Sequence, residues 1–284
     1  MTDSGANWTV ITGSTGGLGR EIAAQLAARG DALILVNRSR TKAEAQREEL
    51  RASRPDLPVE LVTADLMDIA DAAERIAALP GRIDALYNNA GVLTARKTLS
   101  AQGYESQFAV NVLAAYLLIL KLRAKMARPA DAPPAIIVNM SSSAINPLKS
   151  LQLSSLPDPD KVGGLMTTYA QTKLAATALA PALADDLKAD GILIRAVDPG
   201  ATRTPMTTGG NPAMPKILAW LAPVIFAAPD KQAAKVVRSA DPAAFDGATG
   251  IYVANLKRRK LPAPAADASN QRALIKLLDE RLAT

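Results

Sequence analysis

The chain has 284 residues, a net charge of +6, and neither cysteine nor histidine. The lack of cysteine excludes disulfides, thiolate nucleophiles and cysteine metal sites, and the lack of histidine excludes imidazole ligands and the most common general base. No group of carboxylates suggests a magnesium site, so no metal is expected. The basic residues are scattered except for KRRK at 257–260. We interpret that run as a solvated turn rather than a nucleic-acid-binding patch.

Short apolar runs alternate with helical stretches along the chain. The runs expected to be strands are 8–14, 32–38, 59–66, 83–91, 135–142, 192–200 and 250–255, and the expected helices are 17–29, 41–53, 68–79, 104–128, 167–189, 229–239 and 268–282. Most of the strand runs are apolar throughout, as in parallel strands buried on both faces. The pattern predicts a single α/β domain over residues 1–284, a doubly wound (Rossmann) seven-stranded parallel sheet with helices on both faces.

Two long irregular stretches, 143–166 and 201–228, follow the fifth and sixth expected strands. Open α/β sheets bind ligands at the carboxyl ends of strands, so we expect both stretches to form the substrate side. The second stretch is either an apolar lid hinged at Gly209–Gly210 or a short surface helix packed on the core. The lid residues would be Met206, Met214, Ile217, Leu218, Trp220 and Leu221.

The N-terminal stretch MTDSGANWTV is polar and shows no secretory signal. The longest apolar stretch, 217–229, is too short and too rich in proline to cross a bilayer. A cytoplasmic protein is therefore expected.

The first expected strand runs into TGSTGGLGR at 12–20 and then into a helix. Glycines let a ligand approach the backbone closely, and a helix N-terminus offers free N–H groups and a positive dipole end to a phosphate. This context predicts a dinucleotide-binding turn. The residues expected to contact the cofactor there are Gly13, Ser14, Thr15, Gly17, Leu18 and Gly19.

The second expected strand ends in NRSR at 37–40. NAD-binding folds usually place an acidic residue here to hold the ribose 2′-hydroxyl, whereas an arginine accommodates the 2′-phosphate of NADP. The carboxylate is absent, Asn37 can bond a ribose, and Arg38 can offer its planar guanidinium to the phosphate. The expected cofactor is therefore NADP(H) rather than NAD. The alternative is that these residues only begin a solvated helix.

Further motifs follow in chain order. They are Asp65 in TADL, Asn88-Asn89-Ala90-Gly91, Asn111 in VNVLAAY, Ser142 in NMSSS, Tyr169 and Lys173, and Pro199-Gly200 with Thr204. Together with the glycine turn they resemble the short-chain dehydrogenase/reductase family over essentially the whole chain. The turn fits the shorter subtype through Gly13, Gly17 and Gly19, and the extended subtype through Gly13, Gly16 and Gly19. Chain length and NNAG favour the shorter subtype.

Tyr169 and Lys173 lie four residues apart in an expected helix, and so on one face of it. A phenol has a reference pKa of about 10, too high for acid–base catalysis at neutral pH. A nearby ammonium and a cationic nicotinamide would both favour the phenolate, and lowering the pKa by about 3 units needs about 4 kcal/mol. We interpret Tyr169 as the proton donor in carbonyl reduction and the base in alcohol oxidation.

The resemblance implies roles for the other residues. Ser142 would polarise the substrate carbonyl, Lys173 would also hold the nicotinamide ribose, and Asn111 would help to retain a water that links Lys173 to solvent. Asp65 and Leu66 would contact adenine, and Asn89 would support the ribose side. The remaining cofactor contacts would be Ala90, Gly91, Pro199, Gly200, Thr202 and, near the nicotinamide amide, Thr204.

The spacing between Ser142 and Tyr169, 27 residues, is about twice what is common in the family. Ser154 and Ser155 fit the common spacing better, but only Ser142 follows a strand, so we prefer Ser142. The extra segment 146–168 resembles the insertion of the retinol-dehydrogenase and protochlorophyllide-reductase-like branch. That branch acts largely on bulky apolar carbonyls and alcohols, and such a substrate is expected here.

Pro181 is expected to kink the helix that carries Tyr169. In many family members that helix and the one expected at 104–128 form a dimer interface, so a homodimer is possible, with Pro181 putting the packing in doubt. The expected function is an NADP-dependent oxidoreductase that interconverts a carbonyl and an alcohol. The alternatives are a non-catalytic dinucleotide sensor or scaffold of the same fold, and an epimerase or dehydratase that uses the nicotinamide transiently.

Overall fold

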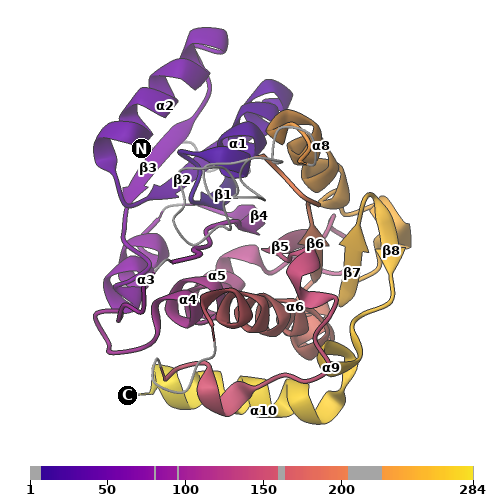
Figure 1. The fold of residues 1–284 in the computed structure, drawn as a ribbon. Helices are drawn as coiled ribbons and strands as arrows, with labels where there is room; N and C mark the ends of the chain where they lie inside the picture. Colours follow the sequence, from indigo (N-terminus) through magenta and orange to yellow (C-terminus); the bar gives the residue numbers. More distant parts are fainter. Residues whose placement is uncertain (1–7, 80, 95, 159–163, 204–225, 284) are drawn as a thin grey trace.

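A single eight-stranded sheet forms the centre of the protein (Figure 1). The computed structural model describes residues 8–79, 81–94, 96–158, 164–203 and 226–283. The strand order is β3-β2-β1-β4-β5-β6-β7-β8, in which all neighbours are parallel except β7 and β8. The strands are β1 Trp8–Thr12, β2 Ala32–Asn37, β3 Val59–Thr63, β4 Ile83–Asn88, β5 Ala135–Met140, β6 Ile192–Asp198, β7 Ile251–Ala254 and β8 Lys257–Arg259.

Helices cover both faces of the sheet, as predicted. The longer ones are α1 Gly17–Arg29, α2 Arg40–Ser53, α3 Ile69–Ala77, α5 Ala114–Met126, α6 Leu165–Ala189, α8 Pro229–Ser239 and α10 Ala268–Leu282. The short ones are α4 Ser106–Phe108, α9 Ala263–Ala266, a π-helical turn η1 Ala109–Leu113, and the 3-10 turns η2 Ser143–Ile145, η3 Leu153–Ser155 and η4 Ala244–Gly247. Helices α1, α2 and α8 lie on one face, and α3, α5 and α6 on the other, with α10 outside α6 (Figure 1).

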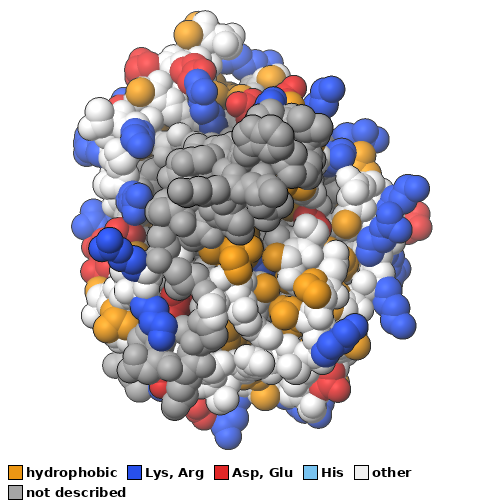
Figure 2. Space-filling model, viewed as in Figure 1, with side chains coloured by type: hydrophobic (Ala, Val, Ile, Leu, Met, Phe, Trp, Pro, Cys, Tyr) orange, Lys and Arg blue, Asp and Glu red, His pale blue; other side chains and the backbone are white. Residues whose placement is uncertain are grey.

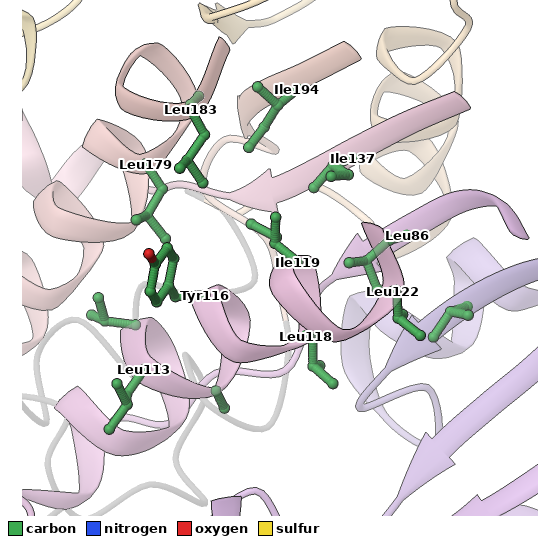
Figure 3. Close-up of a cluster of buried hydrophobic side chains, with 14 of the residues drawn as sticks. Leu86, Leu113, Tyr116, Leu118, Ile119, Leu122, Ile137, Leu179, Leu183 and Ile194 are labelled. Carbon is green, nitrogen blue, oxygen red and sulfur yellow. The ribbon is translucent and has the colours of Figure 1, made fainter. Parts of the chain in front are cut away.

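Two hydrophobic clusters, one on each face of the sheet, form the core. Alternate residues of each strand point to opposite faces, so Val10 joins the cluster beneath α5 and α6 while Ile11 joins the one beneath α1 and α8. Figure 3 shows the first cluster, in which Ile119 and Leu122 of α5 face Ile137 of the sheet. Each fully buried aliphatic side chain stabilises the fold by about 1.5–3 kcal/mol.

One described helical stretch, Ser106–Met126, is long and apolar enough to span a membrane by length and composition. Its most apolar window is 72% buried inside the protein, between the sheet and the neighbouring helices. A core helix passes the same test, so this stretch is weak evidence for a membrane span.

The sheet has eight strands where the sequence predicted seven parallel ones, because the chain turns back after β7. Asn255 and Leu256 have φ values of +52° and +58°, as in a two-residue type I′ hairpin turn. The KRRK run therefore forms the edge strand β8, antiparallel to β7, and not a turn. Its side chains are exposed, which fits charged residues on a sheet edge.

Other boundaries also differ from the predictions. Five expected strands end two or three residues early, and the residues beyond them form the loops of the site described below. The helix expected at 104–128 is divided into α4, η1 and α5. In contrast, α6 continues through Pro181 to Ala189, although proline removes one backbone hydrogen bond.

Candidate active site

A cavity of about 830 Å³ lies at the carboxyl ends of β1, β2, β4, β5 and β6. The expected site residues that line it are Gly13, Thr15, Gly17, Leu18, Gly19, Asn37, Arg38, Asp65, Leu66, Asn89, Ala90, Gly91, Ser142, Tyr169, Lys173, Pro199, Gly200 and Thr202. Ser14 and Asn111 lie behind the wall, and Thr204 is outside the described residues, as are the six candidate lid residues. The folding of one sheet therefore brings together motifs spread over almost 190 residues.

The glycine turn needs glycine at three positions. Gly13 and Gly17 have φ values of +67° and +52°. A Cβ on Gly19 would lie 2.3 Å from the Gly13 carbonyl oxygen and 2.4 Å from the Asn89 side chain. Gly16 has an extended φ of −158°, and a Cβ there would meet nothing within 4 Å. This is the pattern of the shorter subtype, and Gly16, which the extended pattern requires, is structurally replaceable.

A buried polar network braces this turn from behind. The Asn37 amide donates to Ser14 Oγ at 2.8 Å and accepts from the Thr15 N–H at 3.1 Å. Ser14 Oγ in turn donates to Gln46 Oε1, and Gln46 donates to the Ser14 carbonyl. Asn37, expected to bond a ribose, therefore directs its amide into the protein. Gln46 was not identified from the sequence, because it lies in a charged stretch of α2 with no motif around it.

Asn89 braces the same turn from β4. Its amide donates to the carbonyls of Thr12 and Gly13 at 2.9 and 3.1 Å. The next N–H, of Ala90, donates to Thr12 Oγ1 at 2.9 Å. The NNAG motif therefore ties β4 to the end of β1, and Ala90 and Gly91 form the adjoining cavity wall.

Arg38 and Asp65 lie together at the far end of the cavity from Tyr169, on the loops after β2 and β3. Both side chains are exposed. Asp65 Oδ1 accepts the N–H of Met67 at 3.0 Å, which closes a tight turn. Nearby Arg40 forms an ion pair with Glu44 at 2.8 Å. The guanidinium that the cavity presents is that of Arg38.

Ser142, Tyr169 and Lys173 line the opposite end of the cavity. Ser142 caps the N-terminus of η2, two residues after the end of β5, whereas its neighbour Ser141 is buried and bonds Thr177. Ser154 and Ser155 do not line the cavity. Cavity lining thus agrees with the preference for Ser142 over Ser154 and Ser155, although Ser141 and Ser143 line the cavity as well.

Burial dominates the titration of the tyrosine and the lysine. It raises the pKa of Tyr169 to about 12, while a hydrogen bond with Ser142 lowers it and the Asp198 charge raises it further. Burial lowers the pKa of Lys173 to about 8, opposed by Asp198. Lys173 Nζ donates to the Met140 carbonyl at 2.9 Å. Without a cofactor, the predicted lowering of the Tyr169 pKa is absent, because desolvation of the phenolate outweighs the other effects.

Asn111 lies in the π-helical turn η1, where its amide links three segments. It accepts from the Val92 N–H at 2.8 Å, and donates to the Val92 carbonyl and to Thr172 Oγ1, both at 3.1 Å. A Cβ on Gly91 would lie 3.4 Å from Asn111 Oδ1 and 3.2 Å from Lys173 Nζ. Asn111 therefore holds the loop after β4 against the helix that carries Tyr169.

The loop after β6 closes the site. Gly200 has a φ of +82°, and Thr202 Oγ1 donates to the Gly200 carbonyl at 2.9 Å. Asp198, the last residue of β6, also lines the cavity. The sequence analysis named Pro199-Gly200 but gave no role to the aspartate before them, although its position at a strand end was a usable signal.

Comparison with known proteins agrees with this geometry. Residues 7–214 match the family model described as short chain dehydrogenase. The chain belongs to the short-chain dehydrogenase family. It is 30% identical to retinol dehydrogenase 13 of Homo sapiens over 272 residues, which covers 91% of this chain and 78% of that protein. Retinol dehydrogenase 12 of Bos taurus is 34% identical over 198 residues, covering 69% of this chain and 61% of that one.

Solved short-chain dehydrogenase-like structures share the fold. One is a blue fluorescent protein from a metagenomic library in complex with NADPH, with 27% identity and a TM-score of 0.64 over 88% of this chain and 96% of that one. The relatives confirm the expected similarity of this short-chain dehydrogenase to the retinol-dehydrogenase branch. Membership places the chain among oxidoreductases.

Proposed function

We propose that this protein is an NADP-dependent oxidoreductase that interconverts a carbonyl and an alcohol on a bulky apolar substrate. The observation that carries the proposal is that Ser142, Tyr169 and Lys173 share one cavity with the glycine turn. The residues proposed to bind the nucleotide therefore adjoin those proposed to transfer the proton, as hydride transfer requires.

The residues present fit a nicotinamide dinucleotide. The turn needs glycine at Gly13, Gly17 and Gly19, and Gly17 begins α1, whose free N–H groups suit a pyrophosphate. The same cavity is lined by Arg38 and by Tyr169, so an adenosine end and a reacting end of the dinucleotide would both find their proposed partners there. A bound nicotinamide would supply or accept the hydride.

Each remaining step belongs to this chain. Ser142 donates a hydrogen bond to the substrate oxygen, and Tyr169 transfers a proton to it in reduction or removes one in oxidation. Burial keeps Tyr169 in the phenol form at neutral pH, which is the form needed to reduce a carbonyl. Lys173 in its charged state and the positive charge of an oxidised nicotinamide would both favour the phenolate in the reverse direction. Asn111 holds the loop beside Lys173 and would help to retain a water there.

The substrate end of the cavity is apolar. Its lining includes Val92, Leu93, Met140, Pro147, Met166 and Phe226. Such a wall favours a hydrophobic substrate over an anionic one. The retinol dehydrogenases among the relatives carry a name consistent with this preference.

The first test compares wild type with Tyr169→Phe on a panel of apolar aldehydes and ketones, following NADPH absorbance. Loss of the general acid should reduce kcat by about 10²–10⁴-fold while the NADPH dissociation constant stays within about threefold. Equal turnover by both proteins would contradict the proposal. Binding of NADPH without turnover of any carbonyl by wild type would favour the sensor instead, and substrate conversion without a net change in absorbance would favour an epimerase.

Cofactor preference is tested with Arg38→Ala, using Arg40→Ala as the matched control. Arg38 faces the cavity, whereas Arg40 is paired with Glu44. Loss of one charge-assisted contact with the 2′-phosphate should weaken NADPH binding by about 10–100-fold and leave NADH binding unchanged. The Arg40 variant should bind both cofactors like wild type. Equal NADPH and NADH affinities in wild type, indifferent to Arg38, would contradict the NADP assignment.

A cytoplasmic location and a homodimer stay predictions. Two relatives named as chloroplastic belong to the same family, so family membership does not decide the compartment. Figure 2 shows the described Lys and Arg side chains of one face of the protein spread around its margin.

A further inference from the structure

Asp198 is a buried carboxylate beside the proton-transfer residues, and the mechanism above does not use it. It is 7% exposed at the end of β6. It lines the cavity together with Tyr169 and Lys173. The other carboxylate in the described lining, Asp65, is exposed on the loop after β3, next to Arg38 and Leu66.

The sheet register explains where Asp198 points. Ala196 of β6 pairs with Tyr252 of β7, and both belong to the cluster beneath α6. Side chains two residues apart on a strand share a face, so Asp198 faces the same side as Ala196. That side carries α6 with Tyr169 and Lys173.

Two donors hold the carboxylate in place. The Gly200 N–H donates to Oδ1 at 2.8 Å, and the Tyr252 hydroxyl donates to Oδ2 at 3.2 Å. Both donors favour the charged form of Asp198, against the effect of burial. Tyr252 is itself buried, at 5% exposure, so this arrangement is not a surface contact.

Lys173 lacks a carboxylate hydrogen-bond partner in the described structure. Its hydrogen-bond acceptor is the neutral Met140 carbonyl, and it is 5% exposed. Burial lowers its pKa to about 8, and the charge of Asp198 acts in the opposite direction. The same charge raises the pKa of Tyr169. The described ionisable groups around Asp198 are thus Tyr169 and Lys173 of α6 and Tyr252 of β7, with Arg259 of β8 beyond Tyr252.

We propose that Asp198 is a positioning residue of this site: its carboxylate, fixed by Tyr252 and Gly200, is the counter-charge that keeps Lys173 protonated and Tyr169 in its phenol form. Its part in turnover rests on the proposed oxidoreductase function. The same carboxylate accepts the Gly200 N–H and so holds the Pro199–Gly200 turn, which lines the cavity. Asp198 therefore affects both the electrostatics of the site and the conformation of this turn.

The test variant is Asp198→Asn, which removes the charge and can still accept the Gly200 N–H. Tyr252→Phe is the matched control, because it removes a hydrogen bond and leaves the carboxylate. Removing a negative charge lowers the pKa of every nearby group. Two unit charges ~10 Å apart at an effective dielectric constant of ~20 shift a pKa by about one unit.

Two readouts are measured. In the cofactor-free protein, the titration of Lys173 is followed by NMR of lysine labelled at the ε-carbon and assigned with Lys173→Met. In the enzyme, kcat/KM for carbonyl reduction is measured against pH, and falls once Tyr169 or Lys173 loses its proton. Asp198→Asn should move the Lys173 midpoint and the alkaline fall of kcat/KM to lower pH by about one unit. Tyr252→Phe should move neither, even if the rate falls.

The outcomes are separable. An unmoved Lys173 midpoint in Asp198→Asn overturns the inference, whatever the activity. If the Lys173 midpoint shifts in Asp198→Asn but wild type reduces no carbonyl, the counter-charge role of Asp198 holds and the proposed oxidoreductase function is contradicted. A lower rate with an unmoved pH profile would show that Asp198 only anchors the loop, which also overturns the counter-charge role. If Asp198→Asn does not fold, Asp198→Ser removes the same charge with a smaller side chain.

Discussion

Three asparagine side chains of this site form hydrogen bonds that hold its loops in place, a role that the sequence motifs do not indicate. Asn37, Asn89 and Asn111 were each expected to contact the cofactor or its water. In the structure their amides bond backbone or buried hydroxyl groups of neighbouring loops. A buried loop needs partners for its backbone N–H and C=O groups, and asparagine supplies a donor and an acceptor in one short side chain. These residues shape the cavity first, and their direct contacts with a ligand stay predictions.

At Gly19 the addition of a single methyl group is expected to disrupt the conformation of the glycine turn. Gly19→Ala should lower the free energy of unfolding by about 1–3 kcal/mol and abolish NADPH binding, because its Cβ would lie 2.3 Å from the Gly13 carbonyl oxygen. Gly16→Ala should change the free energy of unfolding and the NADPH affinity little, because a Cβ on Gly16 would meet nothing within 4 Å. Urea unfolding and fluorescence titration measure both. Equal damage in the two variants would contradict the shorter-subtype geometry.

Lys173 should cost the protein stability at neutral pH. Its folded pKa of about 8 lies below its ordinary value of 10.5, so below pH 8 folding buries a charge that the unfolded chain solvates. Between pH 8 and 10.5 the unfolded chain holds a proton that the folded chain lacks, and wild-type stability rises with pH. Lys173→Met should therefore have a higher free energy of unfolding than wild type at pH 7, by on the order of 3 kcal/mol, with the difference closing by pH 10.5. A difference independent of pH would show that Lys173 has the same pKa in the folded and unfolded chains.

At the scale of elements, the helix α6 carries Tyr169 and Lys173, the residues proposed to transfer the proton, and also holds the segment that follows η2. We call residues 146–158 the strap. This segment follows η2 and contributes Pro147 to the cavity. Gln171, between Tyr169 and Lys173, accepts the Gln152 N–H and donates to the Ser150 carbonyl, both at 3.0 Å. Buried Leu151 and Leu156 attach the strap to the same core. The strap and the catalytic turn are therefore coupled through one side chain.

Gln171→Leu keeps the volume of the side chain and removes both hydrogen bonds to the strap. It should destabilise the protein by about 0.5–1.5 kcal/mol per lost bond, raise KM for bulky substrates several-fold and leave kcat nearly unchanged. Steady-state kinetics and limited proteolysis of the strap check this. Ser155→Ala, which removes a bond to Gln152 on the exposed side of the strap, is the control. A loss confined to kcat would place Gln171 in the chemical step instead.

At the scale of the whole molecule, the C-terminal helix α10 covers the outer side of α6, one of the two helices predicted to form a dimer interface. It packs on α6 and α9, and its Leu274 and Leu278 are fully buried in the main core cluster. The Tyr116 hydroxyl of α5 donates to Asp279 at 2.6 Å, and α10 lies along the outer side of α6 in Figure 1. A homodimer through α5 and α6 would have to displace this helix or extend it.

Leu278→Ala tests how firmly α10 is attached. Removal of a fully buried leucine side chain should lower the free energy of unfolding by about 2–5 kcal/mol, whereas Lys276→Ala, on the exposed side of the same helix, should change it by less than about 0.5 kcal/mol. Thermal unfolding and sedimentation are measured together. Unchanged stability of Leu278→Ala would mean that α10 detaches easily, and a dimer would then be expected to use that face.

The sequence by itself determined the fold class, the order of the strands and helices, and the residues that meet in the site. It could do so because these depend on local signals: apolar runs of strand length, glycines before a helix, and polar residues directly after strands. Those signals also selected Ser142 and Tyr169, which line one cavity in the structure.

Only the tertiary structure decided what the side chains do there. The roles of Gln46 and Gln171 depend on segments 32 and 19–21 residues away in the chain, so nothing next to them identifies them. The eighth strand depends on a hairpin turn at Asn255–Leu256 that lacks the usual glycine. The high pKa of Tyr169 and the low pKa of Lys173 follow from burial, and burial is a property of the packed molecule rather than of any motif.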